Sequence, residues 1–115
     1  MAQKQDLERI WNDFQDAVNM TPASLDTWLN TDDSRESGWK EDGGDETIGH
    51  HSGRRIVEIK RKKKDELTQH DYEHMRKVIG FVHRHLKQGG PKDDKEHSPW
   101  RHSLMNWGHD PLKND

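Results

Sequence analysis

Apolar residues return every three or four positions along much of the chain, which is the spacing of one buried face of an α-helix. The clearest case is Leu7, Ile10, Phe14 and Val18 near the beginning of the sequence. No segment shows the strict alternation of apolar and polar residues that is typical of a half-buried strand. The pattern therefore predicts an all-α fold of about five helices, in a single domain over residues 1–115.

Capping residues indicate where two of the later helices begin. Thr21 followed by Pro22 opens a short second helix, because threonine accepts from free backbone N–H groups and proline suits the first helical position. Thr68, with Asp71 three residues later, forms a capping box for the longest helix, about residues 69–88. That helix carries the apolar stripe Tyr72, Met75, Val78, Ile79, Val82 and Leu86.

A short C-terminal helix is predicted over residues 98–107. A serine and a proline open it, and Gly108 ends it. Trp100, Leu104 and Trp107 lie at positions i, i+4 and i+7, so they share one face over two turns. We expect this helix to dock on the rest of the protein and to complete its core.

Two connecting segments have no periodicity. Residues 30–49 are acidic and contain four glycines, and they predict a long surface loop in which Trp39 is the one anchor. Residues 89–97 predict a polar linker that leads to the C-terminal helix.

The composition limits the size of the core. Leu, Ile, Val and Phe number 7, 5, 4 and 2, which is 18 of 115 residues, but five tryptophans can each bury roughly 150–250 Å². The absence of cysteine excludes disulfides and thiolate metal sites. No apolar run has the length of a signal peptide or a membrane helix, so we expect a cytoplasmic protein with no membrane partner.

The net charge of −3 conceals a polarity along the chain. Residues 1–49 carry 4 Lys/Arg and 12 Asp/Glu, a balance of −8. Residues 50–89 carry 11 and 5, a balance of +6, and residues 90–115 carry 4 and 5, a balance of −1. This asymmetry is typical of a protein with one basic binding face, although the acidic and basic parts of one chain can also pair with each other.

The basic part lies in a predicted helical hairpin, in which a third helix capped by Ser52 leads through a short turn into the longest helix. Self-pairing at i, i+4, as in Arg54–Glu58 and Arg61–Asp65, is the competing interpretation of the third helix, at about 0.2–0.5 kcal/mol per pair. Lysine and arginine give sequence-independent affinity for phosphates. The residues expected at a nucleic acid are Arg54, Arg55, Lys60, Arg61, Lys62, Lys63, Lys64, Arg76, Lys77, Gly80, Arg84 and Lys87.

Gly80 lies in the middle of the flank between Arg76 and Arg84. A glycine inside a helix costs about 1 kcal/mol relative to alanine, so its presence calls for an explanation. Two explanations have equal standing: close approach of a phosphate backbone, or tight packing of another helix.

Neither a metal site nor catalysis is expected. His70 and His74 have the i, i+4 spacing with which two imidazoles meet one metal ion, but no further ligand has a recognisable spacing. His109 and Asp110 form a pair of the kind that orients a base, but no nucleophile is placed with them. We therefore expect a protein that is not an enzyme and that needs no metal or cofactor.

Three stretches of the sequence carry a resemblance to a known family. They are "WNDFQDAVNMTPASLDTWL", "GHHSGRRIVEIKRKKKDELTQHDYEHMRKVIGFVHRHL" and "WRHSLMNWGHDPLK", which together cover most of the chain. With them the chain resembles domain of unknown function family 3140, whose members are often labelled DNA-binding. The resemblance implies one small domain and supplies no catalytic residue.

The expected function is non-enzymatic association with nucleic acid, most simply DNA, through phosphate contacts of the basic hairpin and largely without regard to sequence. Such a protein would be associated with the nucleoid or the nucleus. The alternative is a protein-interaction or stress-associated module whose basic half binds an acidic protein partner.

Overall fold

The computed structural model describes residues 4–38, 40 and 46–113, in which six α-helices form. They are α1 (Lys4–Ala17), α2 (Pro22–Leu29), α3 (Asp32–Glu36), α4 (Ile48–Arg61), α5 (Gln69–Gln88) and α6 (Pro99–Asn106). Short 3₁₀ turns at Lys64–Glu66 and Lys95–His97 precede α5 and α6. Over the described ranges the only extended pairing is an isolated bridge between Lys40 and Thr47. The predicted all-α fold is confirmed.

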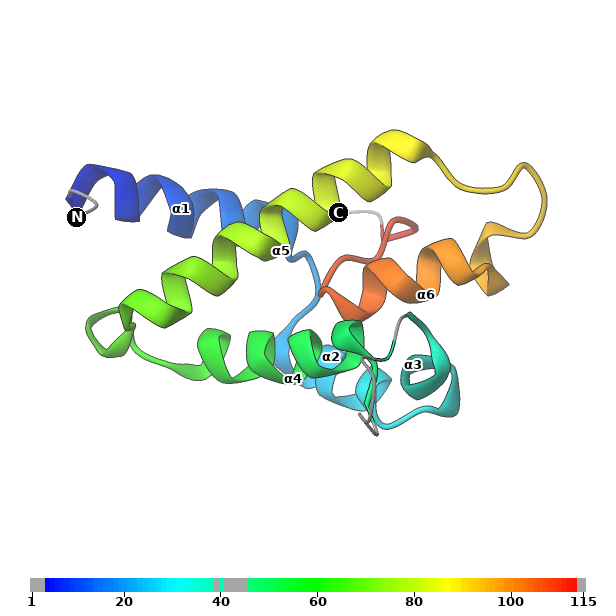
Figure 1. The fold of residues 1–115 in the computed structure, drawn as a ribbon, viewed down its shortest axis with the longest axis horizontal. Coiled ribbons are helices and arrows are strands. Elements are labelled where there is room, and N and C mark those ends of the chain that lie inside the picture. Colours follow the sequence, from blue (N-terminus) through cyan, green and yellow to red (C-terminus); the bar gives the residue numbers. More distant parts are fainter. Residues whose placement is uncertain (1–3, 39, 41–45, 114–115) are drawn as a thin grey trace.

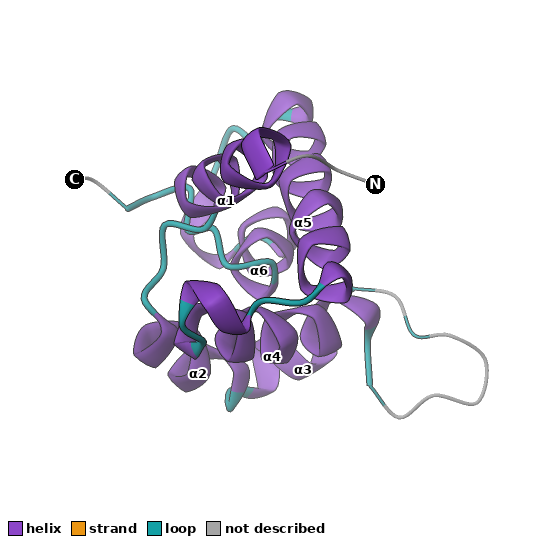
Figure 2. Ribbon diagram, turned by 90° about the vertical axis from the view of Figure 1, so that its left-hand side faces the viewer, coloured by secondary structure: helices purple, strands orange, loops and turns teal. Residues whose placement is uncertain are grey.

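Two helix pairs and one central helix build the domain. α1 packs along α5, and α2 packs along α4, so that the two pairs form an upper and a lower layer (Figure 1). α6 lies between the layers and contacts α2, α4 and α5 (Figure 2). None of the helices in the described part of the chain is both long enough and apolar enough to cross a membrane.

The core forms where these layers meet. Phe14 from α1, Leu25 from α2, Ile56 from α4, Met75 from α5 and Leu104 from α6 all have no exposed surface. These five helices therefore contribute their apolar stripes to one continuous cluster, which is how a chain with few large aliphatic residues excludes water.

One member of the predicted α5 stripe lies outside this core. Leu86 is 37% exposed, because α5 extends past the end of α1 and leaves its last turns without that cover (Figure 1).

Three predicted helix starts are confirmed by their caps. The Oγ atoms of Thr21, Thr68 and Ser98 accept from backbone N–H groups three residues later, at 3.1, 3.2 and 3.2 Å. The side chain of Asp71 also accepts from the backbone N–H of Thr68 at 3.0 Å, which completes the capping box at the start of α5.

The prediction that Ser52 caps the third helix is wrong. Thr47 caps α4 instead, accepting from the His50 backbone N–H at 3.1 Å, and Ser52 lies buried inside the helix. The earlier start places Gly49 and Gly53 one turn apart on the side of α4 that faces α6. A Cβ atom at Gly53 would lie 2.6 Å from the backbone oxygen of Asn106, so only glycine allows this approach.

The segment expected to be one long loop, residues 30–49, contains helical residues. It contains α3, which Thr31 caps, and the first residues of α4. Ser34 on α3 is fully buried, and its hydroxyl is satisfied because it donates to the side-chain oxygen of Asn106. The predicted anchor Trp39 lies outside the described residues.

The C-terminal helix docks as predicted, although its tryptophans are not fully buried. Leu104 has no exposed surface, while Trp100 and Trp107 are partly exposed at the edge of the core. Trp100 also donates its indole N–H to the backbone oxygen of His85 at 2.9 Å, which ties α6 to the end of α5.

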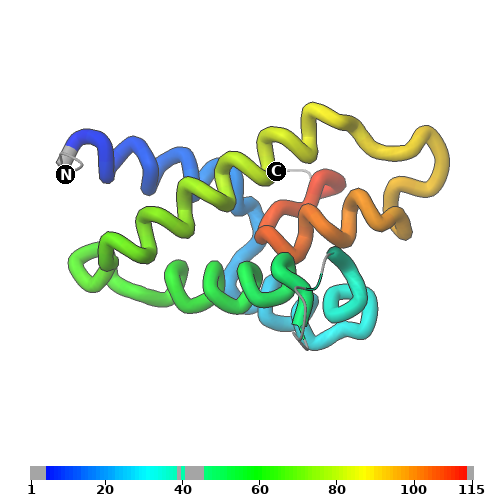
Figure 3. The backbone as a smooth tube through the Cα atoms, viewed as in Figure 1, coloured from blue at the N-terminus to red at the C-terminus, as the bar shows by residue number. Residues whose placement is uncertain are grey.

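The chain after α6 returns to the junction between α1 and α2 (Figure 3). The ring Nδ1 of His109 bonds the backbone oxygen of Ala17 at 2.8 Å. Asp110 accepts from the Arg101 guanidinium at 3.1 and 3.0 Å, in a two-point ion pair. Both side chains of the sequence pair His109–Asp110 are thus used to fix the tail in place.

Candidate nucleic-acid interface

Asp71 binds two of the twelve residues predicted to contact nucleic acid. Its carboxylate is almost fully buried and pairs with Arg55 at 3.1 Å and with Lys62 at 2.8 Å. Burial raises the pKa of Asp71, but hydrogen bonds from Lys62 and Thr68 and the charge of Lys62 outweigh that effect and lower it to about 2. From the middle of α4 and from its C-cap, the two cations therefore link this helix to the start of α5.

Two further cations of the predicted set are also held within the chain. Arg54 pairs with Glu46 at 2.8 Å, and Lys60 donates to the backbone oxygen of Val18 at 3.1 Å. Burial lowers the pKa of Lys60, and the nearby Lys113 lowers it further. Lys60 thereby satisfies a carbonyl just past the end of α1, a position that favours a cation.

The end of α4 is close to neutral overall. Arg61, Lys63 and Lys64 are exposed there, but so are three acids of the same segment, Glu58, Asp65 and Glu66. Three cations and three anions balance, so this segment gives little net attraction for phosphates.

The exposed side of α5 is different. Four of its cations are exposed, and among the described residues none of the four makes an ion pair. The exposed acid of α5 is Glu73, because Asp71 is buried, so the exposed side carries four cations and one anion, a balance of +3. We call this surface the α5 cation face, and its residues are Arg76, Lys77, Arg84 and Lys87.

The α5 cation face is also long. At about 1.5 Å of rise per residue, Arg76 and Lys87 are separated by roughly 16 Å along the helix axis. That span covers several phosphates of an extended strand.

Gly80 in the middle of this face is not a helix-packing contact. A Cβ atom there would meet only the guanidinium of Arg84, at 3.0 Å, and no backbone or core side chain. The structure thus excludes the packing explanation for Gly80. The bare helix surface lets the Arg84 side chain fold back along α5.

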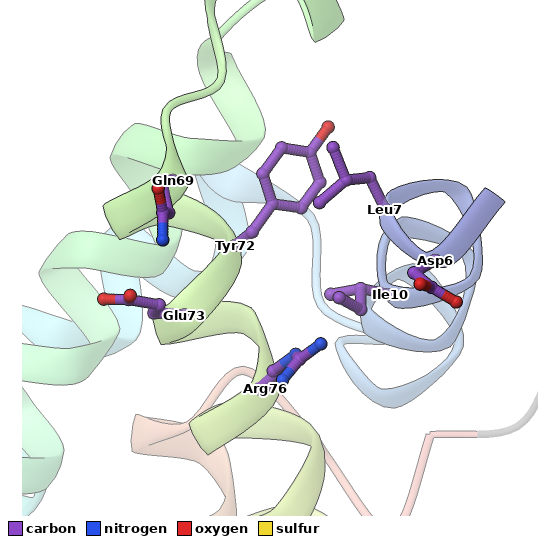
Figure 4. Close-up of a pocket in the computed structure, with 7 residues that line it drawn as sticks. All are labelled: Asp6, Leu7, Ile10, Gln69, Tyr72, Glu73 and Arg76. Carbon is purple, nitrogen blue, oxygen red and sulfur yellow. The ribbon is translucent and has the colours of Figure 1, made fainter. Parts of the chain in front are cut away.

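A groove of about 450 Å³ separates the Arg76 end of the face from α1 (Figure 4). Leu7 and Ile10 of α1 and Tyr72 of α5 form its apolar part. Asp6 and Glu73 add two carboxylates beside Arg76. Because these carboxylates offset the charge of Arg76, the attraction for phosphate is concentrated in the part of the face that contains Lys77, Arg84 and Lys87.

The histidine pair His70–His74 is divided between two environments. His70 is 87% exposed, whereas His74 is half-buried with its Nε2 atom 2.9 Å from the Ser52 hydroxyl. Burial lowers the pKa of His74 to about 4, with a further contribution from Arg55. In the described part of the chain no three histidine, aspartate or glutamate side chains come together as a metal site.

The Ser52–His74 contact joins α4 to α5 and was not foreseen from the sequence, because Ser52 was placed at a helix cap. The Ser52 residue is 1% exposed and none of the described acids bonds His74, so the contact closes the interface between the two helices. His74 also stacks on Trp107, with ring centres 6.2 Å apart and planes 11° apart.

Asn106 is the other important residue that sequence reasoning missed. It has no exposed surface, and its side chain bonds the indole N–H of Trp28 and the hydroxyl and backbone oxygen of Ser34. A lone asparagine before a tryptophan gives no sequence signal of this role. The two glycines Gly49 and Gly53, four residues apart, do give a sequence signal for the close contact between α4 and α6.

One known protein family matches most of the chain. Residues 13–105 match the family described as "Protein of unknown function (DUF3140)". The chain belongs to this family. The match begins in the last turns of α1 and ends within α6, so it contains α2 to α5 and the whole α5 cation face. No curated protein and no solved structure matches the chain at a significant level.

Proposed function

We propose that this protein is a non-enzymatic nucleic-acid-binding protein, and that the α5 cation face contacts the phosphates. The observation that carries the proposal is the balance of +3 on the exposed side of one helix, with four cations that have no ion-pair partner in the described structure. Cations without an ion-pair partner have no internal contact to break before they bind phosphate, and their binding releases condensed counterions from the nucleic acid. Binding of this kind is largely independent of sequence.

The structure leaves fewer cations available for phosphate contact than the twelve-residue set expected from the sequence would supply. Arg54, Arg55, Lys60 and Lys62 already have partners inside the chain, so binding phosphate would require breaking those contacts. The contribution of the α4 end is small because its charges balance. The main contacts are therefore assigned to the α5 cation face, and chiefly to Lys77, Arg84 and Lys87.

The proposal is tested by measuring the affinity of the full chain for a fluorescent DNA duplex by anisotropy over a range of salt concentrations. The test variant changes Lys77, Arg84 and Lys87 to Gln. If each side chain meets one phosphate, its slope of log affinity against log salt flattens by about 2–3 relative to the unchanged protein. All three residues are exposed, so thermal melts of the variant are expected to match those of the parent.

A matched control changes Arg61, Lys63 and Lys64 to Gln, which removes the same charge from the balanced end of α4. It is expected to shift the slope by less than one unit. If the slope of log affinity against log salt flattened equally in the two variants, net charge alone, and not the α5 cation face, would govern binding. No binding to nucleic acid at low salt, with binding to polyglutamate retained, would replace the proposal with an acidic protein partner.

A further inference from the structure

A second pocket lies on the side of α5 next to the cation face. It has a volume of about 470 Å³, within the roughly 300–1,000 Å³ of ligand sites. Three helices and the turn after α3 enclose it. The residues that shape it are Phe81 and His85 of α5, Ser103 of α6 with Trp107 at its end, and Ile48 and Gly49 of α4.

Aromatic rings form one wall of this pocket. The rings of Trp107 and Phe81 stack with centres 4.4 Å apart and planes 14° apart, and those of Phe81 and His85 stack at 4.8 Å and 18°. His74 continues the column behind Trp107. Mutual stacking covers both faces of Phe81 and Trp107 and fixes the orientations of the rings. The ring face left for a planar ligand is the outer face of His85, which stacks on no other ring among the described residues, and the edges of Phe81 and Trp107 complete this preformed wall.

The opposite wall is apolar and uncovered by described residues. Ile48 is 41% exposed although it borders the aromatic wall. Gly49 is buried and packs closely against the Trp107 indole, since a Cβ atom there would lie only 3.2 Å from the indole nitrogen.

Polar groups in the pocket are free to recognise a heterocycle. The Ser103 hydroxyl and the Trp107 indole N–H have no hydrogen-bond partner among the described residues. A hydroxyl can donate and accept, and an indole N–H donates, which matches the mixed edge of a nucleobase.

The pocket is adjacent to the α5 cation face on the same helix. Lys77, Phe81 and Arg84 lie at i, i+4 and i+7 on α5, so two cations flank an aromatic residue of the pocket wall. The acidic helix α3 lies on the other side of the pocket from α5 (Figure 1). This arrangement favours a nucleic-acid strand whose phosphates contact Lys77 and Arg84 while one of its bases lies between the walls of the pocket.

We infer that this pocket accepts an unpaired nucleobase, so that the preferred ligand of the α5 cation face is single-stranded nucleic acid. The inference rests on the proposed function and names its ligand class. Bases of a duplex are paired and stacked inside the helix, and extracting one costs energy that a single strand does not pay. Stacking on aromatic side chains supplies affinity without sequence preference.

The test uses three DNA probes of equal length with the full chain: a single strand, a duplex, and a strand with abasic residues that keeps the phosphates and lacks the bases. The single strand is expected to bind about tenfold more tightly than the abasic strand. The variant Ile48→Glu places a carboxylate in the pocket and is expected to abolish this tenfold preference. Ile48 is exposed and lies in the first turn of α4, where an acid is favourable, so folding is expected to survive.

Leu112→Glu serves as the matched control, because Leu112 is 39% exposed, lies outside the pocket lining and receives the same charge. This control is expected to keep the preference for the single strand. Equal affinity for the single and abasic strands, or an unchanged preference in Ile48→Glu, would overturn the inference and leave phosphate binding by α5 intact. Absence of binding to all three probes would overturn both proposals together.

Discussion

Protonation of His74 is expected to make the folded protein less stable in mild acid. The imidazole lies against Ser52 and Trp107 beside the cation Arg55, and burial followed by that charge lowers its pKa from the ordinary 6.5 to about 4. The folded state thus binds this proton less readily than the unfolded chain. The stability that depends on neutral His74 is fully present above pH 6.5 and is lost as the pH falls from 6.5 toward 4.

The magnitude follows from the two pKa values. With about 4 in the folded state and 6.5 in the unfolded state, the His74 contribution to the free energy of unfolding falls by about 2 kcal/mol between pH 7 and pH 5. The variant His74→Gln removes the titration and keeps a polar group near Ser52. It is expected to be less stable at pH 7, because the stacking on Trp107 is lost, but to lose about 2 kcal/mol less on acidification.

Urea unfolding at pH 7, 6 and 5, followed by tryptophan fluorescence and far-ultraviolet circular dichroism, measures the difference. His70→Gln is the matched control, since His70 lies one turn earlier on the same helix and is 87% exposed. The control is expected to show the same pH dependence as the parent. If His74→Gln also follows the parent between pH 7 and pH 5, His74 is not held neutral by its surroundings and the explanation is refuted.

Three further substitutions test the packing and charge assignments. Gly53→Ala is expected to lower the free energy of unfolding by about 1–3 kcal/mol in urea titrations, because the new methyl group meets the Asn106 backbone; an unchanged midpoint would contradict this close contact. Gly80→Ala is expected to raise it by about 1 kcal/mol, since only the movable Arg84 side chain must shift, and a loss of stability would restore the helix-packing explanation. Asp71→Asn is expected to cost about 2 kcal/mol at pH 7. The pKa of Asp71 in the folded state is lowered to about 2, so its contribution to the free energy of unfolding is present above pH 4 and is lost as the pH falls through 2. The free energies of unfolding of the parent and of Asp71→Asn should therefore converge in strong acid.

The sequence by itself determined the helices whose signals are local. A side-chain oxygen that caps the backbone three residues later depends on nothing distant, and Thr21, Thr68 and Ser98 were found for that reason. The apolar stripes likewise follow from the period of the α-helix, so the all-α class and the docking of α6 were predictable.

The tertiary structure decided where α4 begins. Thr47 and Ser52 are both good caps, and the sequence offered no way to choose between them. Starting at Thr47 gives the helix Gly49 and Gly53 at its contact with α6, and turns Ser52 toward His74. The selection comes from close packing with elements far along the chain, which local propensity does not encode.

The tertiary structure also decided which cations are available. The sequence shows a run of positive charge but not the carboxylate that meets it. Arg55 and Lys62 converge on Asp71, 16 and 9 residues away. By contrast, no residue of the α5 cation face forms an ion pair with an acid in the described part of the chain. Charge interactions depend on separation in space and on burial, so the same residue types are structural on α4 and available for binding on α5.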